Sequence, residues 1–126
     1  MSKRIQIRIK PRVFWRILFI IVVVVVSALF VMQTPPTPSI ASFAHADKVV
    51  HFGLFFVLAT TMHLAFRPRL WIALPILFVY AMGIEVAQHH IPGRGADIWD
   101  VVADMLGVLG FYIARAAYKK HKKRSL

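Results

Sequence analysis

The sequence contains no cysteine and only five acidic residues in 126. The absence of cysteine excludes disulfides and thiolate metal sites, but it leaves the redox compartment open. Polar residues are scarce as well, because 59% of the chain is hydrophobic, which is well above the usual range for soluble proteins. A small membrane protein with a single domain is therefore the first class to test.

Acidic charge is missing from both ends of the chain, whose formal net charge is +11. The few carboxylates all lie in the middle: Asp47, Glu85, Asp97, Asp100 and Asp104. An ionisable group inside an apolar segment is costly unless it is paired, so these positions point to a function. The basic residues instead cluster at residues 3–16 and 115–124, beside long apolar runs. Contact with anionic lipid explains such clusters, and we predict no nucleic-acid partner.

Four apolar runs are predicted to form transmembrane helices, over residues of about 13–32, 48–66, 70–89 and 97–118. Segments unsuited to helix separate them: a proline-rich stretch at 33–38, the turn at 67–69 and a loop at 90–96. The predicted fold class is all-α, a four-transmembrane-helix polytopic protein that forms one membrane domain over residues 1–126.

The distribution of basic residues predicts an orientation. If the N-terminus is cytoplasmic, every lysine and arginine except Lys48 and Arg94 lies on the cytoplasmic side. This asymmetry follows the positive-inside rule, so we expect both termini in the cytoplasm and the protein in the bacterial inner membrane. An alternative is a signal peptide cleaved after Ala44-His45-Ala46. A long segment separates that site from the apolar run, which favours an uncleaved helix.

In this topology all five acids lie at the outer side, and helical spacing places them on three polar faces. These faces hold Asp47 with His51, Glu85 with Gln88 and His89, and Asp97 with Asp100 and Asp104. Polar faces inside a membrane are expected to meet one another rather than lipid. Gly107 and Gly110 continue the last face, where small residues allow another helix to approach closely.

Helix capping is a simpler explanation for some of the acids. Asp97 is a plausible N-cap, and Asp47 is placed to cap the second helix. Capping does not account for Glu85, which lies near the C-terminal end of its helix, where the dipole disfavours an anion. Nor does it account for Asp104, about 10 Å further along the last helix than Asp97. The available partners of Asp104 are Arg94, Lys48 and His51.

Four short blocks share a recognisable order and spacing: Asp47-Lys48-x-x-His51-Phe52, Glu85-x-x-Gln88, Pro92-Gly93-Arg94-x-x-Asp97-x-x-Asp100 and Gly107-x-x-Gly110. Together they resemble the VanZ-like family of small bacterial membrane proteins, over residues of about 47–112. In that family the position of Asp104 is usually asparagine, so the net charge of the site differs here. The family is named after a protein associated with low-level teicoplanin resistance. The resemblance therefore implies an envelope-related role, but it supplies no reaction.

The first of three functional hypotheses is a protein that recognises or modifies a lipid-linked envelope component or a glycopeptide-type antibiotic. Arg94 and Lys48 would hold phosphate or carboxylate, and the acids would accept hydrogen bonds from hydroxyls or amines. The candidate binding residues are Asp47, Lys48, His51, Glu85, Gln88, Arg94, Asp97, Asp100 and Asp104. The expected partners are membrane lipids and a lipid-linked precursor, and the oligomeric state stays open.

The second hypothesis is an intramembrane hydrolase or transferase. Either His51 would act as a general base oriented by Asp47, or Glu85 and Asp100 would form an acid–base pair. A metal version would use His51, Glu85, His89 and Asp100, but no HExxH or similar spacing supports it. We therefore predict no metal or other cofactor and assign no catalytic residue. The third hypothesis is a structural polar network without a ligand, and the absence of internal repeats disfavours a transporter.

Overall fold

The structure is a computed structural model that describes residues 9–32, 46–92 and 97–125. It contains four helices: α1 (Pro11–Val31), α2 (Ala46–Phe66), α3 (Leu70–His89) and α4 (Ile98–Ser125). No strand occurs among the described residues. All four helices are long and apolar enough to cross a membrane, judged by length and composition. The predicted all-α class with four transmembrane helices is confirmed, and the chain is a multi-pass membrane protein with four candidate spans.

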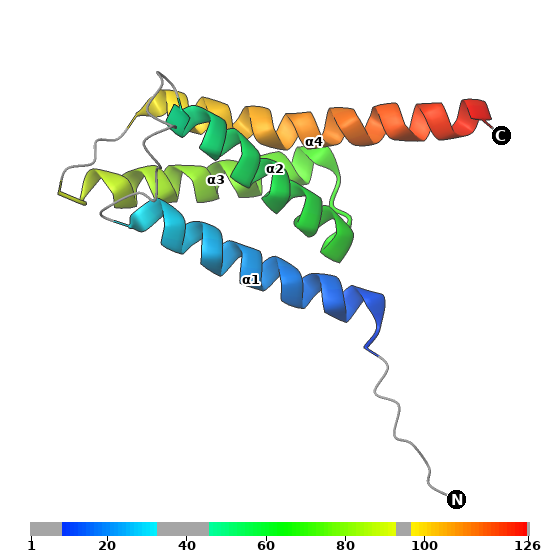
Figure 1. Cartoon of the computed structure of the whole chain (residues 1–126), viewed down its shortest axis with the longest axis horizontal. Helices are drawn as coiled ribbons and strands as arrows, with labels where there is room; N and C mark the ends of the chain where they lie inside the picture. Colours follow the sequence, from blue (N-terminus) through cyan, green and yellow to red (C-terminus); the bar gives the residue numbers. More distant parts are fainter. Residues whose placement is uncertain (1–8, 33–45, 93–96, 126) are drawn as a thin grey trace, which may run out of the picture.

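The helices differ in their bounds from the predicted apolar runs, most of all at the end of α4. We expected this helix to end near residue 118, but it continues to Ser125. The added turns are rich in lysine and arginine, which form helix well and interact favourably with the C-terminal end of the helix dipole. Its 28 residues span about 42 Å, more than the hydrocarbon core of about 30 Å. Figure 1 shows these last turns projecting beyond the other helices.

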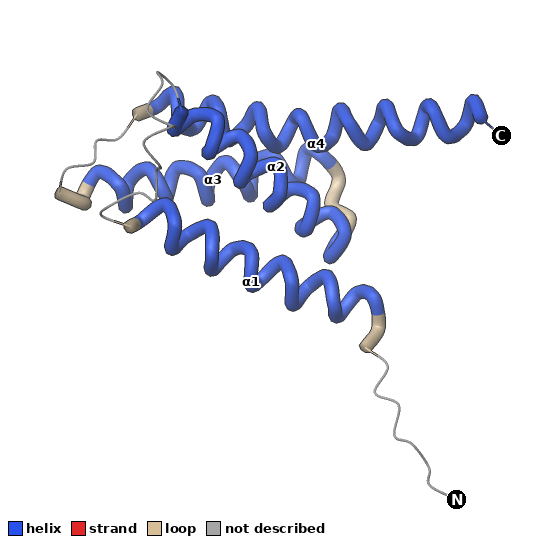
Figure 2. Tube along the Cα trace, viewed as in Figure 1, coloured by secondary structure: helices blue, strands red, loops and turns tan. Residues whose placement is uncertain are grey.

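Successive helices run in opposite directions, so the bundle has two distinct ends (Figure 1). The acidic end holds the last turns of α1 and α3 and the first turns of α2 and α4. The basic end holds the first turn of α1, the turn at 67–69 and the end of α4. Figure 2 shows the short loop that joins α2 to α3 at the basic end. This up-and-down arrangement brings all the predicted polar faces to one end of the molecule.

Packing between the helices is uneven. α2 packs most extensively against α4 and next against α1, whereas α3 has a smaller contact with α4 and a slight one with α1. The order around the bundle is therefore α1, α2, α4, α3. The core residues Phe55, Leu58 and Val108 are fully buried between these helices. Outward-facing side chains are also apolar, for example Val79 at 70% exposure, as expected of a surface that contacts lipid.

α2 and α4 approach most closely where α4 carries glycine. A Cβ atom at Gly107 would overlap the backbone carbonyl oxygen of Phe52, and one at Gly110 would lie 3.1 Å from the ring carbon Cζ of the same residue. This geometry agrees with the predicted role of the two glycines in close helix packing. The contact lies one turn from Asp104, and it holds the polar faces of α2 and α4 together.

Candidate functional site

Polar side chains from three helices meet at the acidic end and form a group that we call the acidic cluster. It comprises Asp47, Lys48, His51, Glu85, Gln88, Asp97, Asp100 and Asp104. These are the predicted site residues with the exception of Arg94, which lies outside the described residues. The members that are buried are His51, Glu85, Gln88, Asp100 and Asp104. The cluster is thus a largely enclosed polar site in an otherwise apolar bundle.

His51 on α2 lies between two carboxylates of α4. Its Nδ1 is 2.7 Å from Oδ1 of Asp104, which is a hydrogen bond, and its Nε2 is 3.6 Å from Oδ2 of Asp100, which is too long for one. With Asp104 ionised, Nδ1–H donates this hydrogen bond, and in the neutral imidazole Nε2 then turns its lone pair toward Asp100. The residue that orients His51 is therefore Asp104, and the expectation that Asp47 would do so is wrong.

Lys48 is surrounded by acids. Its Nζ lies 2.8 Å from Oδ2 of Asp97, 3.3 Å from Oδ1 of Asp100 and 3.5 Å from Oδ2 of Asp47. An ammonium group has three donors, and three carboxylates are in place to accept them. The geometry therefore argues against the expected contact between Lys48 and a phosphate or carboxylate of a ligand. Lys48 instead neutralises part of the acidic charge of the cluster.

Asp97 caps α4 and also belongs to the cluster. Its Oδ1 accepts a hydrogen bond of 3.0 Å from the backbone N–H of Trp99, which confirms the predicted capping role. The Lys48 ammonium, and then the Trp99 N–H, lower the pKa of the Asp97 carboxyl below its ordinary value. Asp47, in contrast, lies within the first turn of α2 rather than at the position before the helix.

Glu85 on α3 contacts the beginning of α4. Its Oε2 accepts a hydrogen bond of 2.9 Å from the backbone N–H of Asp97. The carboxylate therefore lies at the N-terminal end of α4, where the helix dipole favours an anion. Capping does account for Glu85, contrary to our expectation, because the helix that it caps is α4 and not its own.

Two carboxylate oxygens of the cluster are buried without a hydrogen-bond partner. They are Oε1 of Glu85 and Oδ2 of Asp104. The Asp104 residue has no exposed surface, and Glu85 is only 5% exposed. Leaving a buried acceptor unpaired costs free energy, so such atoms are commonly explained by a ligand, an ion or a proton.

α1 closes one side of the cluster. The ring of Phe30 stacks on the imidazole of His51, with centroids 4.4 Å apart and planes inclined by 22°. Gln88 Nε2 donates a hydrogen bond of 2.9 Å to the carbonyl oxygen of Phe30, which satisfies an open acceptor in the last turn of α1. Sequence reasoning missed Phe30, because one apolar residue in a continuous apolar run gives no sign of its neighbours.

A groove between α3 and α4 opens beside the cluster. Its cavity volume is about 500 Å³, and the described residues that line it are Met82, Glu85, Val86, His89, Ile98 and Val101. His89 is exposed on this groove. One ligand atom each of His51, Glu85 and Asp100 lies within 4.8 Å of the others, and His89 is not among them. Three of the four residues considered for a metal site thus converge, and His89 does not join them.

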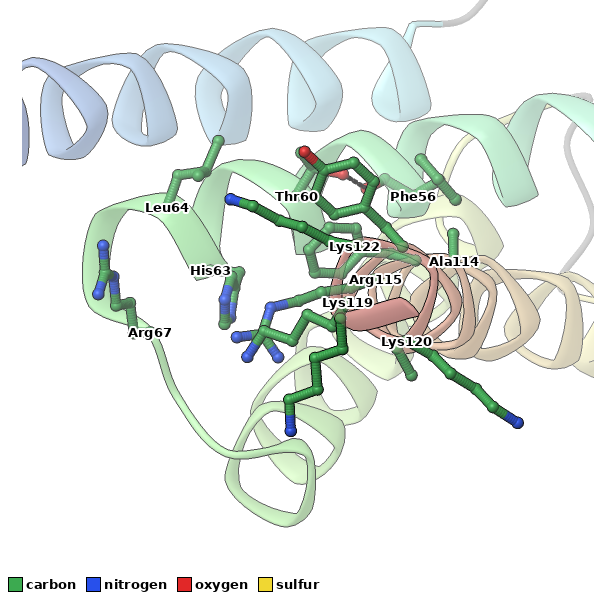
Figure 3. Close-up of a pocket in the computed structure, with 14 residues that line it drawn as sticks. Phe56, Thr60, His63, Leu64, Arg67, Ala114, Arg115, Lys119, Lys120 and Lys122 are labelled. Carbon is green, nitrogen blue, oxygen red and sulfur yellow. Dashed lines mark hydrogen bonds between the residues drawn. The ribbon is translucent and has the colours of Figure 1, made fainter. Parts of the chain in front are cut away.

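A second hollow, of about 1220 Å³, lies between α2 and α4 toward the basic end. Figure 3 shows cationic side chains among those that line it: Arg67 just after α2, and Arg115, Lys119 and Lys122 on α4. No carboxylate is among the lining residues in the described part of the chain. Basic pockets of this kind suit the headgroups of anionic lipids.

Within the acidic cluster, acids outnumber bases. Asp47, Glu85, Asp97, Asp100 and Asp104 face Lys48 and His51 among the described residues. A site with an excess of carboxylates attracts hydroxyl and amine donors or cations, and it repels phosphate. The imidazole, with a carboxylate near each ring nitrogen, is also arranged for proton transfer.

Comparison with protein families matches the VanZ/LLP1 family over residues 5–118, which is most of the chain. No curated protein and no solved structure gives a match. The matched range begins well before residue 47, where the recognisable blocks start, and it includes α1. It thus covers Phe30 as well as every member of the acidic cluster, and the chain belongs to the VanZ/LLP1 family.

Proposed function

We propose that this protein binds a lipid-linked component of the bacterial envelope, with the hydrocarbon chain in the α3–α4 groove and the polar headgroup at the acidic cluster. The observation that carries this proposal is the groove itself. Apolar side chains of both helices, such as Val86 and Ile98, lead from the outer surface of the bundle to the buried carboxylate of Glu85. A lipid chain fits such a surface in the membrane, and the headgroup then meets a polar site.

The chemistry of the cluster indicates which headgroups fit. Because Lys48 is engaged by three carboxylates, recognition would depend on the free acceptors, foremost Oε1 of Glu85. Sugar hydroxyls and amines donate to such acceptors. Both groups occur in lipid-linked envelope precursors and in glycopeptide-type antibiotics, which makes a role in the envelope or in antibiotic resistance the natural extension of the proposal.

The proposed orientation places the acidic cluster at the outer face of the inner membrane. The first residues of α1 and the last residues of α4 lie at the basic end, opposite the cluster (Figure 1). Cytoplasmic termini would keep the lysines and arginines of α4 inside, in agreement with the positive-inside rule. A reporter fused after Leu126 should then be read as cytoplasmic, and an external signal would overturn the orientation.

Photo-cross-linking in native membranes tests the lipid proposal. A photoreactive residue at Val86, in the groove, should capture a defined lipid-linked species that mass spectrometry identifies. The matched control is Val79, an exposed valine two turns away on the same helix that does not line the groove. Glu85→Gln should reduce capture at Val86. Equal capture of bulk phospholipid at both positions, unchanged by Glu85→Gln, would show annular lipid only and refute the proposal.

Acid–base catalysis on the same lipid is a second candidate function. The arrangement that favours it is His51 hydrogen-bonded to Asp104 with its other nitrogen facing Asp100. In this case the lipid captured at Val86 by the wild-type protein would differ in mass from that captured by His51→Gln. Identical masses in the two proteins would leave binding as the function.

A further inference from the structure

We infer that His51, Glu85 and Asp100 bind one divalent transition-metal ion of the zinc or manganese class, with Asp104 as the residue that positions His51. One ring nitrogen and two carboxylate oxygens of these residues lie within 4.8 Å of one another, and all three residues are buried. Imidazole and carboxylate together suit such ions. The inference rests on the proposed function only in placing the ion at the head of the lipid groove.

The first argument is the distance between His51 and Asp100. When the imidazole is neutral and Nδ1 carries its proton, Nε2 and Oδ2 are both acceptors and face each other at 3.6 Å in a buried site, which is unfavourable unless a proton or a metal ion lies between them. Two ligands of a tetrahedral ion, each bound at about 2.0–2.2 Å, are separated by about 3.4 Å. The observed distance is close to that separation, and it is too long for a direct hydrogen bond.

The second argument is the orphaned oxygen of Glu85. Oε2 is engaged by the backbone of Asp97, whereas Oε1 is buried without a hydrogen-bond partner. Glu85 comes from α3 and therefore completes the set across the helix interface. A metal ion would give this side chain a partner and would draw α3 toward α2 and α4.

The third argument is the hydrogen bond behind the imidazole. Histidines that bind metals usually donate their other ring N–H to a carboxylate, which fixes the tautomer and the ring orientation. Asp104 provides this contact at 2.7 Å from Nδ1, and Phe30 stacks on the same ring. The imidazole is thus held in place with Nε2 directed toward Asp100.

A second group of acids, Asp47 with Asp97 and Asp100, also has ligand atoms close together. A lysine side chain already supplies the positive charge between them. The ammonium of Lys48 lies within 3.5 Å of an oxygen of each member. Asp100 is shared: its Oδ1 faces Lys48 and its Oδ2 faces His51. One oxygen of Asp100 thus belongs to a site that lysine already occupies, and the other oxygen belongs to the site proposed for a metal ion.

Titration with Co²⁺, followed by its visible absorption, tests the inference on the full chain purified in detergent after chelator treatment. We expect about one equivalent per chain, displaced by Zn²⁺, with a spectrum of nitrogen and oxygen ligation. Glu85→Gln keeps an acceptor for the Asp97 N–H but removes the anionic ligand, and it should abolish the spectrum. Asp104→Asn should weaken Co²⁺ binding by about 10–100-fold, as expected when the partner of a ligating histidine is changed.

The control removes two adjacent exposed histidines near the cluster, His89 and His90, because exposed imidazoles can bind metals adventitiously. The double variant His89→Gln/His90→Gln should bind Co²⁺ as the wild type does, because both imidazoles lie outside the cluster. Circular dichroism and gel filtration check that each variant is folded. If Glu85→Gln does not fold, thermal unfolding of the wild-type protein decides, since a bound ion must raise its melting temperature.

The inference is refuted if the wild-type protein shows no ligand-field spectrum and no thermal shift, or if the double histidine variant loses binding while Glu85→Gln retains it. Cross-linking at Val86 with and without chelator separates this result from the proposed function. If the wild-type protein captures the lipid but binds no Co²⁺ when the ion is supplied, the inference alone is overturned. Loss of lipid capture with intact metal binding would overturn the proposed function alone.

Discussion

The two ends of the bundle differ in the number, the burial and the pairing of their charged side chains. At the acidic end the charges are few and arranged in contact, as in the buried pair of Asp104 with His51 and the half-buried pair of Asp97 with Lys48. At the basic end the charges are many and mostly exposed around an open hollow, as Lys119 and Lys120 illustrate (Figure 3). Buried charges must be matched by partners, whereas exposed ones interact with water and lipid phosphate. Substitutions should therefore be far more damaging at the acidic end.

The largest effect is expected for Asp104→Ala. It removes the carboxylate that holds Nδ1 of His51 and leaves a buried polar ring without its partner, which should cost about 3–5 kcal/mol of unfolding free energy. Asp104→Asn is the matched control, because an amide oxygen still accepts the hydrogen bond, and its cost should be much smaller. Equilibrium unfolding in mixed detergent measures both. Equal losses for alanine and asparagine would contradict the importance of this hydrogen bond.

The next effect concerns packing just below the cluster. Gly107→Ala places a methyl group against the Phe52 carbonyl and should cost about 1–3 kcal/mol through forced separation of α2 and α4. Gly83→Ala provides the comparison, since nothing lies within 4 Å of a Cβ atom there. This second change should stabilise the protein by about 0.5–1 kcal/mol through helix propensity. The same unfolding assay applies, and a destabilising Gly83→Ala would undermine the steric explanation.

A smaller effect is expected when one lysine is neutralised at each end. Lys48→Met leaves three carboxylates without their common cation and should lower the melting temperature measurably. Lys119→Met alters an exposed side chain beside other cations and should leave the melting temperature unchanged. Parallel thermal scans at one ionic strength compare the two variants. If both variants melt alike, the contrast between the two ends of the bundle is mistaken.

The smallest effect is a pH dependence from Asp97. Its pKa is lowered in the folded protein, so its contribution to stability is present above the ordinary carboxyl value and is lost as the pH falls through the lower folded value. Asp97→Asn removes this titration and should flatten the acid limb of the melting temperature plotted against pH. Thermal scans of the two proteins across the acidic range check the expectation. If the melting temperatures of the two proteins fall equally as the pH is lowered, groups other than Asp97 cause the pH dependence.

The fold could be predicted from the sequence because apolar runs, turns and basic flanks are local signals. The end of α4 was misplaced because helix propensity continues past the last apolar residue, through Lys119 to Ser125. Convergence of the polar faces also followed from topology together with helical spacing. Residue order alone could suggest Asp47 as the partner of His51, since they are one turn apart, but the contact is made by Asp104 across the helix interface.

Contacts between helices explain the other differences between the sequence-based predictions and the structure. Glu85 lies at the wrong end of its own helix for capping. Only the packing of α3 beside the start of α4 reveals that it accepts a hydrogen bond from the backbone N–H of Asp97. Phe30 covers His51 from a helix outside the recognisable sequence blocks. The sequence suggests that Lys48 is free to contact a ligand, because two of its three acidic partners, Asp97 and Asp100, are distant in sequence and approach it only when α4 packs against α2.

The glycine contact between α2 and α4 also bears on how the molecule can open. At Gly107 the backbone of α4 meets the backbone of α2 at Phe52 without a gap, and this pair of helices shares more contact than any other, so we expect the two helices to stay together. α3 has less contact with its neighbours, so we expect it to be the helix that moves if the bundle opens to admit a lipid chain from the side. Spin labels on α3 and α4 should therefore report a wider range of distances than labels on α2 and α4. In such an opening, α2 and α4 would stay in contact at Gly107, while α3 would move and carry Glu85 with it.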